Sequence, residues 1–127
     1  MSPARHLELR LPAEPRSVGE ARERVLEALD SDLDGGRLET LRLLVSEVVT
    51  NAVRHGSEGA PVQLHASWNS HVRVEVVDDG AGFTPAPRNR PLEEPGGYGL
   101  FLVGALADRW GVETNDTTTV WFELAAV

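Results

Sequence analysis

The sequence predicts a single α+β domain with two layers, in which a mixed, mostly antiparallel sheet is covered on one face by three helices. The chain has 127 residues, 41% of them hydrophobic, which suits one domain with one core spanning residues 1–127. Segments in which apolar residues alternate are interspersed with segments of helical spacing. Their order is strand, helix, helix, strand, strand, loop, helix, strand, strand, which favours helices layered on one face of a sheet.

The amino-terminal part is expected to form a strand and a helix. Leucines alternate with polar residues over 6–11, up to Pro12, and indicate a strand. Residues 15–29 are expected to be helical because their apolar residues recur near helical spacing. Those residues are Val18, Ala21, Val25, Leu26 and Leu29. The segment 31–36 then reads as a turn.

A second, stronger helix is expected over residues 37–55. Its apolar stripe consists of Leu38, Leu41, Leu44, Val45, Val48 and Ala52. Glu47, Asn51 and His55 lie on one flank of that stripe, next to the core. Gly56 is expected to end the helix in a left-handed turn.

The rest of the chain alternates between strands, one loop and one helix. Strands are expected over 62–68 and 72–77, joined as a hairpin at residues 69–71. Residues 84–95 hold four of the eight prolines and indicate a loop. A third helix is expected over 100–110, and closing strands over 111–114 and 118–124. The helix should place Leu100, Val103, Leu106 and Ala107 on one face.

Composition excludes several classes of site. The chain has no cysteine, so disulfides, thiolate metal sites and cysteine nucleophiles are absent. Its net charge of -8 argues against direct binding to nucleic acid phosphates. All twelve basic residues are arginine, which excludes a phosphate-binding lysine of the P-loop type. No apolar run is long enough to span a membrane or to act as a signal peptide, so a cytoplasmic location is expected.

The spacing of Glu47, Asn51 and His55 is i, i+4 and i+8, which stacks the three side chains along one helix face. A carboxylate can accept a proton, and a carboxamide oxygen can ligate a hard cation such as Mg²⁺. Glu47 and Asn51 are also compatible with ordinary solvated helix positions. His55 suits a helix carboxyl terminus as well as it suits a ligand contact.

Two glycine-containing segments elsewhere in the chain also carry residues suited to a nucleotide site. Asp78 ends an apolar strand and precedes Gly80 and Gly82, so its carboxylate can accept a hydrogen bond from an exocyclic amine such as that of adenine. Gly97 and Gly99 open a helix, whose free N–H groups favour phosphate oxygens. Alone, the first segment could be an ordinary turn and the second a hinge. Together, and in this order, they predict a nucleotide site.

The sequence resembles the GHKL ATPase superfamily along nearly its whole length. Within it, the run from Glu47 to Gly56 and the short chain are most similar to the anti-sigma-factor serine kinases of bacterial partner switching. Four segments carry the resemblance: Glu47-x-x-x-Asn51-Ala52 as the N-box, Asp78-x-Gly80-x-Gly82-Phe83 as the first glycine box, Gly97-Tyr98-Gly99-Leu100 as the second, and Thr118-Thr119-Val120-Trp121-Phe122 as the closing strand.

This resemblance implies a Bergerat-type ATP-binding fold and a role for each motif. Glu47 would be the general base toward a substrate serine, and Asn51 would bind the Mg²⁺ that bridges the phosphates. Asp78 would recognise adenine, with Thr119 supporting that side. Residues 84 to about 96 would form the ATP lid. The other residues expected at the nucleotide are Arg54, His55, Gly80, Gly82, Phe83, Gly97, Tyr98, Gly99 and Leu100.

The resemblance also implies partners: a sigma factor, a STAS-type anti-anti-sigma protein, and a second copy in a homodimer. An edge strand at residues 7–11 could pair with that second copy. Acidic residues of the first helix are either a solvated face or a docking site for a basic segment: Glu14, Glu20, Glu23 and Glu27.

Two departures from the family pattern leave an alternative open. Thr117 stands where a glycine usually precedes the closing threonine, and Pro95 stands where a basic residue often precedes the second glycine box. Arg88 and Arg90 in the lid are candidates to reach the γ-phosphate. The alternative is an ATP-binding regulatory module that binds partners without phosphotransfer. A third reading, ranked last, is an interaction domain that binds no nucleotide.

Overall fold

The computed structural model describes residues 4–56, 60–79 and 97–126. The elements follow the predicted order: β1 (Arg5–Pro12), α1 (Arg16–Leu29), α2 (Gly35–His55), β2 (Pro61–Trp68), β3 (His71–Asp78), α3 (Gly97–Leu106), β4 (Arg109–Thr114) and β5 (Thr118–Ala125). None of the helices in the described ranges combines the length and the apolar character that crossing a membrane requires.

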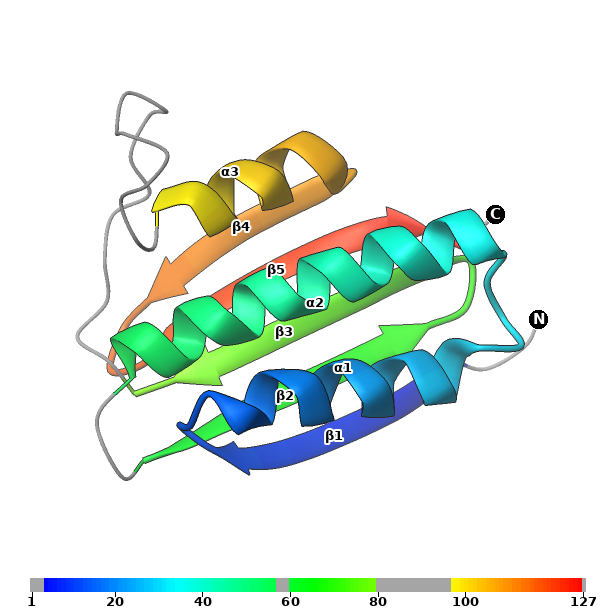
Figure 1. Ribbon diagram of the computed structural model, residues 1–127. Coiled ribbons are helices and arrows are strands. Elements are labelled where there is room, and N and C mark those ends of the chain that lie inside the picture. The colour runs from blue at the N-terminus through cyan, green and yellow to red at the C-terminus, as the bar shows by residue number, and fades with distance from the viewer. Residues whose placement is uncertain (1–3, 57–59, 80–96, 127) are drawn as a thin grey trace.

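The five strands form one open sheet in the order β1-β2-β3-β5-β4. Each of the four pairings is antiparallel, so the sheet is antiparallel where the sequence predicts a mixed one. The three helices lie together on one face of this sheet, with α2 in the middle (Figure 1). The predicted α+β, two-layer architecture is therefore confirmed.

The core lies between the helices and the sheet. Strand residues alternate between buried and partly exposed, and Leu64, Val74 and Phe122 are at most 1% exposed. The predicted stripe of α2 is buried except for Leu38, which is half-buried at the margin of the core. Val49 is fully buried as well, although the stripe read from the sequence omitted it. The buried stripe of α2 is therefore wider than the sequence predicted.

The third helix differs from its predicted range of 100–110. It begins at Gly97 and ends at Leu106, and Trp110 belongs to β4, where it pairs with Phe122. Ala107 and Trp110 are three residues apart, and this spacing imitates a continued helix. The chain turns because the backbone N–H of Asp108 donates to the carbonyl of Glu123 at 2.9 Å. Leu106, expected in the core, is 40% exposed as a result.

Gly56 does not adopt the predicted left-handed conformation. Its φ of -72° and ψ of 159° are extended values that any residue can adopt. The glycine is instead required by close approach, since a Cβ at this position would lie 2.9 Å from the carbonyl oxygen of Ala52 and 3.5 Å from Cβ of Asp78. The end of α2 can therefore pack directly against the end of β3.

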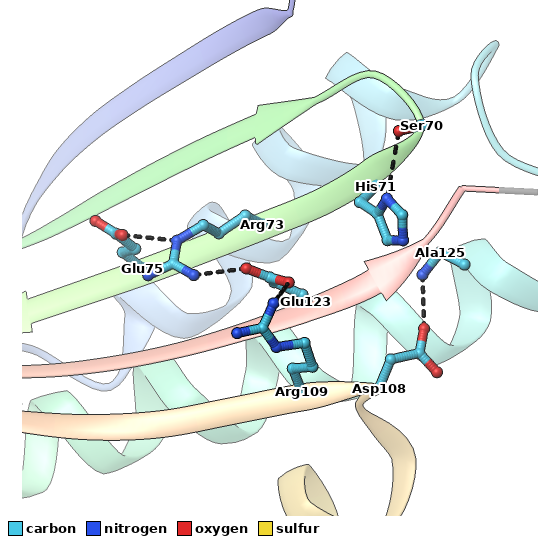
Figure 2. A network of polar contacts seen from close by, with 8 residues as sticks. All are labelled: Ser70, His71, Arg73, Glu75, Asp108, Arg109, Glu123 and Ala125. Atoms are coloured by element: carbon cyan, nitrogen blue, oxygen red, sulfur yellow. Dashed lines mark hydrogen bonds and ion pairs between the residues drawn. The ribbon is translucent and has the colours of Figure 1, made fainter.

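The face of the sheet away from the helices carries a ladder of charges (Figure 2). Arg73 donates to Glu75 at 2.8 Å and to Glu123 at 2.6 Å, and Arg109 lies 3.5 Å from the other oxygen of Glu123. The Arg73 guanidinium also stacks 4.2 Å above the ring of Trp121. Polar groups on this face satisfy one another, and the predicted N-box side chains belong to the opposite, helical layer.

Candidate functional site

Helix α2 carries the N-box residues and is anchored firmly at its amino end. The Asp34 side chain caps the helix by accepting from the backbone N–H of Arg37 at 2.8 Å. This hydrogen bond, together with the Arg37 guanidinium, lowers the pKa of Asp34. Arg37 Nε also donates to the carbonyl of Ala125 at 3.1 Å, which ties the helix to the end of β5. The rotation of α2 about its axis is thereby set by both capping and core packing.

Asn51 is the most informative side chain on this helix. It is 3% exposed, and within the part of the chain that the structure describes neither its Oδ1 nor its Nδ2 has a hydrogen-bond partner. A buried amide left in this state costs about 1–3 kcal/mol. Such groups in native proteins call for an explanation, and a bound ligand is one. The observation fits a site that is completed by a nucleotide and its metal ion.

The donor set also fits Mg²⁺. Among the residues described, no group of three or more histidine and acidic side chains is arranged to hold a metal ion. Mg²⁺ in nucleotide sites commonly takes one or two protein ligands and receives the rest from phosphates and water. A single carboxamide oxygen, that of Asn51, is a suitable ligand for such an ion.

Glu47 lies one helical turn before Asn51 and is partly exposed. Burial raises the pKa of its carboxyl group above the ordinary value of 4.5, and the positive charge of Arg54 opposes that rise. A carboxylate with a raised pKa is a stronger proton acceptor. The position and the basicity of Glu47 therefore both suit a general base.

Asp78 is the last residue of β3 and is 2% exposed. Its register partner on β5 is Thr118, which is 1% exposed and faces the same, helical side of the sheet. Thr119 pairs with Val77 and Glu113 and points to the other side. The structure therefore places Thr118, and not Thr119, beside Asp78 on the helical side of the sheet.

The sequence contained the signal that identifies Thr118. Side chains alternate between the two faces of a strand. Val120, Phe122 and Leu124 are apolar and must face the core, so the inward position two residues before Val120 is Thr118. The sequence analysis instead named Thr119, the next residue along the strand, and the role itself stays a prediction.

The ends of α2 and β3 converge at Gly56, where a Cβ would lie 3.5 Å from Cβ of Asp78, an ordinary contact distance. Arg54 and His55 occupy the last turn of α2 and are exposed there. Two basic residues in that turn complement the helix dipole, whether or not a ligand also contacts them. The carboxylate expected to bind adenine therefore lies against the helix that carries Asn51.

The second glycine box forms the start of α3. Gly97 is the first residue of that helix, as expected for a phosphate-facing amino terminus, and Tyr98 and Gly99 lie in its first turn. Leu100 is 8% exposed and packs in the core. Helices α2 and α3 lie side by side and run in opposite directions, which brings the start of α3 beside the carboxyl-terminal half of α2 (Figure 1). Gly80, Gly82, Phe83 and the predicted lid at 84–96 lie outside the described residues.

Both the sequence and the fold have known relatives. The profile of the family described as histidine kinase-like ATPase domain matches residues 11–124. The chain belongs to this family. One similar protein is the serine-protein kinase RsbW of Oceanobacillus iheyensis, which is 30% identical over 126 residues. The alignment covers 85% of this chain and 78% of that protein. RsbW of Bacillus velezensis is 31% identical over 134 residues, covering 91% and 82%.

Solved structures show the same fold of this ATPase family. A crystal structure of the RsbU and RsbW domains of a Mycobacterium tuberculosis protein aligns with a TM-score of 0.69 at 23% identity, over 95% of this chain and 32% of that chain. This chain therefore spans about a third of that protein. The histidine kinase domain of a blue-light-activated kinase from Erythrobacter litoralis aligns with a TM-score of 0.55 at 26% identity, over 91% and 61%. The GHKL resemblance is confirmed, and so is its closer likeness to RsbW-type serine kinases.

Proposed function

We propose that this protein is an ATP-dependent serine kinase that phosphorylates a STAS-type anti-anti-sigma protein and otherwise sequesters a sigma factor. The observation that carries the proposal is the buried amide of Asn51, which has no hydrogen-bond partner among the described residues. It lies one turn from Glu47, whose carboxylate has a raised pKa. The printed names of the relatives, serine-protein kinases, support the same reaction class.

ATP would be held from three sides. Asp78 would accept a hydrogen bond from the adenine amine, with the hydroxyl of Thr118 beside it. The amino end of α3, at Gly97 and Gly99, would supply N–H groups to phosphate oxygens. Asn51 would hold Mg²⁺, which when bound neutralises charge on the phosphates.

Phosphoryl transfer moves one proton, forms one phosphorus–oxygen bond and breaks another. Glu47 accepts the proton of the substrate serine hydroxyl, and the serine oxygen forms a bond to the γ-phosphorus. The bond between that phosphorus and the oxygen bridging to the β-phosphate breaks, and ADP leaves. The raised pKa of Glu47 favours the proton transfer.

Regulation of transcription follows from the partners in this proposal. The exposed acidic residues of α1, Glu20, Glu23 and Glu27, would receive a basic segment of the sigma factor. β1 is an edge strand of the sheet, so a second copy of the chain would pair there to form a homodimer. The protein would act in the cytoplasm without contacting nucleic acid.

The proposal is tested by incubating the protein with labelled ATP, Mg²⁺ and STAS-type proteins encoded in the same genome. We expect label on a serine of one acceptor. Glu47→Gln should reduce transfer by about 10²- to 10⁴-fold while ATP affinity is retained. If Glu47→Gln transfers as fast as the parent, the assigned mechanism is wrong. Tight ATP binding without any transfer would instead identify the protein as a regulatory binding module.

A further inference from the structure

Three large apolar side chains are exposed among the described residues: Leu43 at 39%, Phe101 at 41% and Leu106 at 40%. Single exposed apolar residues are common and need no explanation. These three all lie on α2 and α3, the two helices that also carry Glu47, Asn51 and the second glycine box. Leu43 and Leu106 are linked through Thr40, as described next, and we refer to these two residues as the apolar seam.

The seam leads from a groove to Glu47. The groove has a volume of about 330 Å³, and Leu106 and Thr40 both line it, with Leu124 as a further apolar side chain. Thr40 and Leu43 are three residues apart on α2, and Leu43 and Glu47 are four apart, so each pair is adjacent on the helix surface. Arg37 and Asp108 supply charge at the same groove.

An acceptor protein whose serine reaches Glu47 must also cover the residues around Glu47. A serine that gives its proton to Glu47 has to come within about 2.6–3.2 Å of the carboxylate. A standard protein interface covers about 800 Å² on each partner, which corresponds to a disc of about 16 Å radius. Thr40 is seven residues from Glu47, or about 10.5 Å along the helix. A folded acceptor protein centred on Glu47 therefore reaches Leu43 and Thr40, at the near edge of the groove.

We propose that the apolar seam and its groove are the docking surface for the phosphoacceptor protein, and that this acceptor carries exposed apolar side chains around its serine. This inference rests on the proposed kinase function. Burial of the seam would give the acceptor much of its affinity, while Glu47 would act on the serine that the docking presents.

The experiment compares Leu43→Ser and Leu106→Ser with the parent. Leu43→Met is the matched control, because it keeps an apolar side chain of similar size on the same helix. The acceptor is the STAS-type protein that receives label from ATP in the transfer assay described above. The KM and kcat for this acceptor are measured for each protein. Calorimetry gives the dissociation constants for that acceptor and for ATP with Mg²⁺. Sedimentation gives the oligomeric state.

The serine variants should each raise the KM and the dissociation constant for the acceptor by roughly three- to tenfold. Their kcat at saturating acceptor and their ATP affinity should stay within about twofold of the parent. Leu43→Met should behave like the parent. Unchanged acceptor binding in both serine variants would overturn the proposal.

Other occupants of the seam give different results, and each would also overturn the proposal. If the chain's own residues cover it, ATP affinity falls as much as acceptor affinity. If a second copy covers it, the serine variants change the oligomeric state. Failure of the kinase function is recognised separately, as acceptor binding by the parent without phosphate transfer. The seam is then judged by the binding constants alone, and a parent that binds no acceptor overturns both proposals.

Discussion

Gly56 and Asp78 meet where helix α2 ends and strand β3 ends. A Cβ built on Gly56 would lie 3.5 Å from Cβ of Asp78 and 2.9 Å from the carbonyl oxygen of Ala52. The contact joins the element that carries Glu47 and Asn51 to the residue expected to bind adenine. The two halves of the candidate site therefore meet at Gly56.

Replacing Gly56 by alanine should strain the end of α2, where the helix lies against Asp78. The backbone at Gly56 suits any residue, so the cost comes only from the 2.9 Å approach to a backbone oxygen, which cannot rotate away. We expect a loss of about 1–3 kcal/mol in the free energy of unfolding, and weaker ATP binding. Gly35→Ala is the control, because a Cβ there meets nothing within 4 Å, and it should leave both quantities unchanged or slightly improved. Equal behaviour of the two variants in urea unfolding and calorimetry would refute the contact's role.

Asn51→Leu should leave the thermal stability of the ligand-free protein intact while weakening its binding of ATP with Mg²⁺. The Asn51 amide is buried and has no partner in the part of the chain that the structure describes. Replacing such an amide with an apolar side chain of similar size is expected to be neutral or stabilising in the absence of ligand. The same change removes the proposed Mg²⁺ ligand, so the rise in melting temperature that ATP with Mg²⁺ gives the parent should disappear. Thermal unfolding with and without the nucleotide measures both effects. A ligand-free variant that melts well below the parent would show that the amide already has partners in the protein.

Glu47→Gln should change how stability depends on pH. Because burial raises the pKa of Glu47 in the folded state, the folded protein binds this proton more tightly than the unfolded chain does. The stability of the parent therefore falls as pH rises from 4.5 through the raised pKa. Glutamine has no such titration, so the variant should gain stability relative to the parent over that window. Urea midpoints at pH 4 and pH 7 check this, and an identical parent–variant difference at both values would contradict it.

Thr118 and Thr119 provide a paired test of the adenine side. Thr118→Val removes a hydroxyl from the buried position opposite Asp78, and should weaken ATP binding by about three- to tenfold. Thr119→Val alters the opposite face of the same strand and should stay within about twofold of the parent. Calorimetric titration of ATP decides between them. If Thr119→Val weakens ATP binding more than Thr118→Val does, Thr119 supports the adenine side, as the sequence analysis expected.

Much of the fold could be predicted because its elements obey simple periodicities. The strands around Leu64, Val74 and Phe122 alternate, and α2 repeats at helical spacing, so the number and order of elements were correct. Errors arose where one pattern imitated another. Trp110 continues the helical spacing of α3 but pairs with Phe122 in β4, and only the long-range hydrogen bonding of Asp108 reveals the turn.

The sequence predicted which candidate site residues lie near one another better than it predicted their individual contacts. The positions of Glu47, Asn51 and Asp78 in the chain suggested a shared site, and the structure puts the helix of the first two against the strand end of the third. Strand alternation would have selected Thr118 over Thr119. Gly56 was read as a conformational requirement, whereas its reason is the close approach of an added Cβ to the carbonyl oxygen of Ala52. That distance depends on the path of the backbone after the helix, which the residue pattern does not specify.

The most direct test of the account is a crystal structure of the protein with Mg²⁺ and a non-hydrolysable ATP analogue. The quantity to measure is the distance between Mg²⁺ and Oδ1 of Asn51. The account predicts a coordination distance of about 2.1 Å, with the adenine amine hydrogen-bonded to Asp78. A nucleotide bound elsewhere, or an Asn51 amide paired only with protein groups, would contradict it.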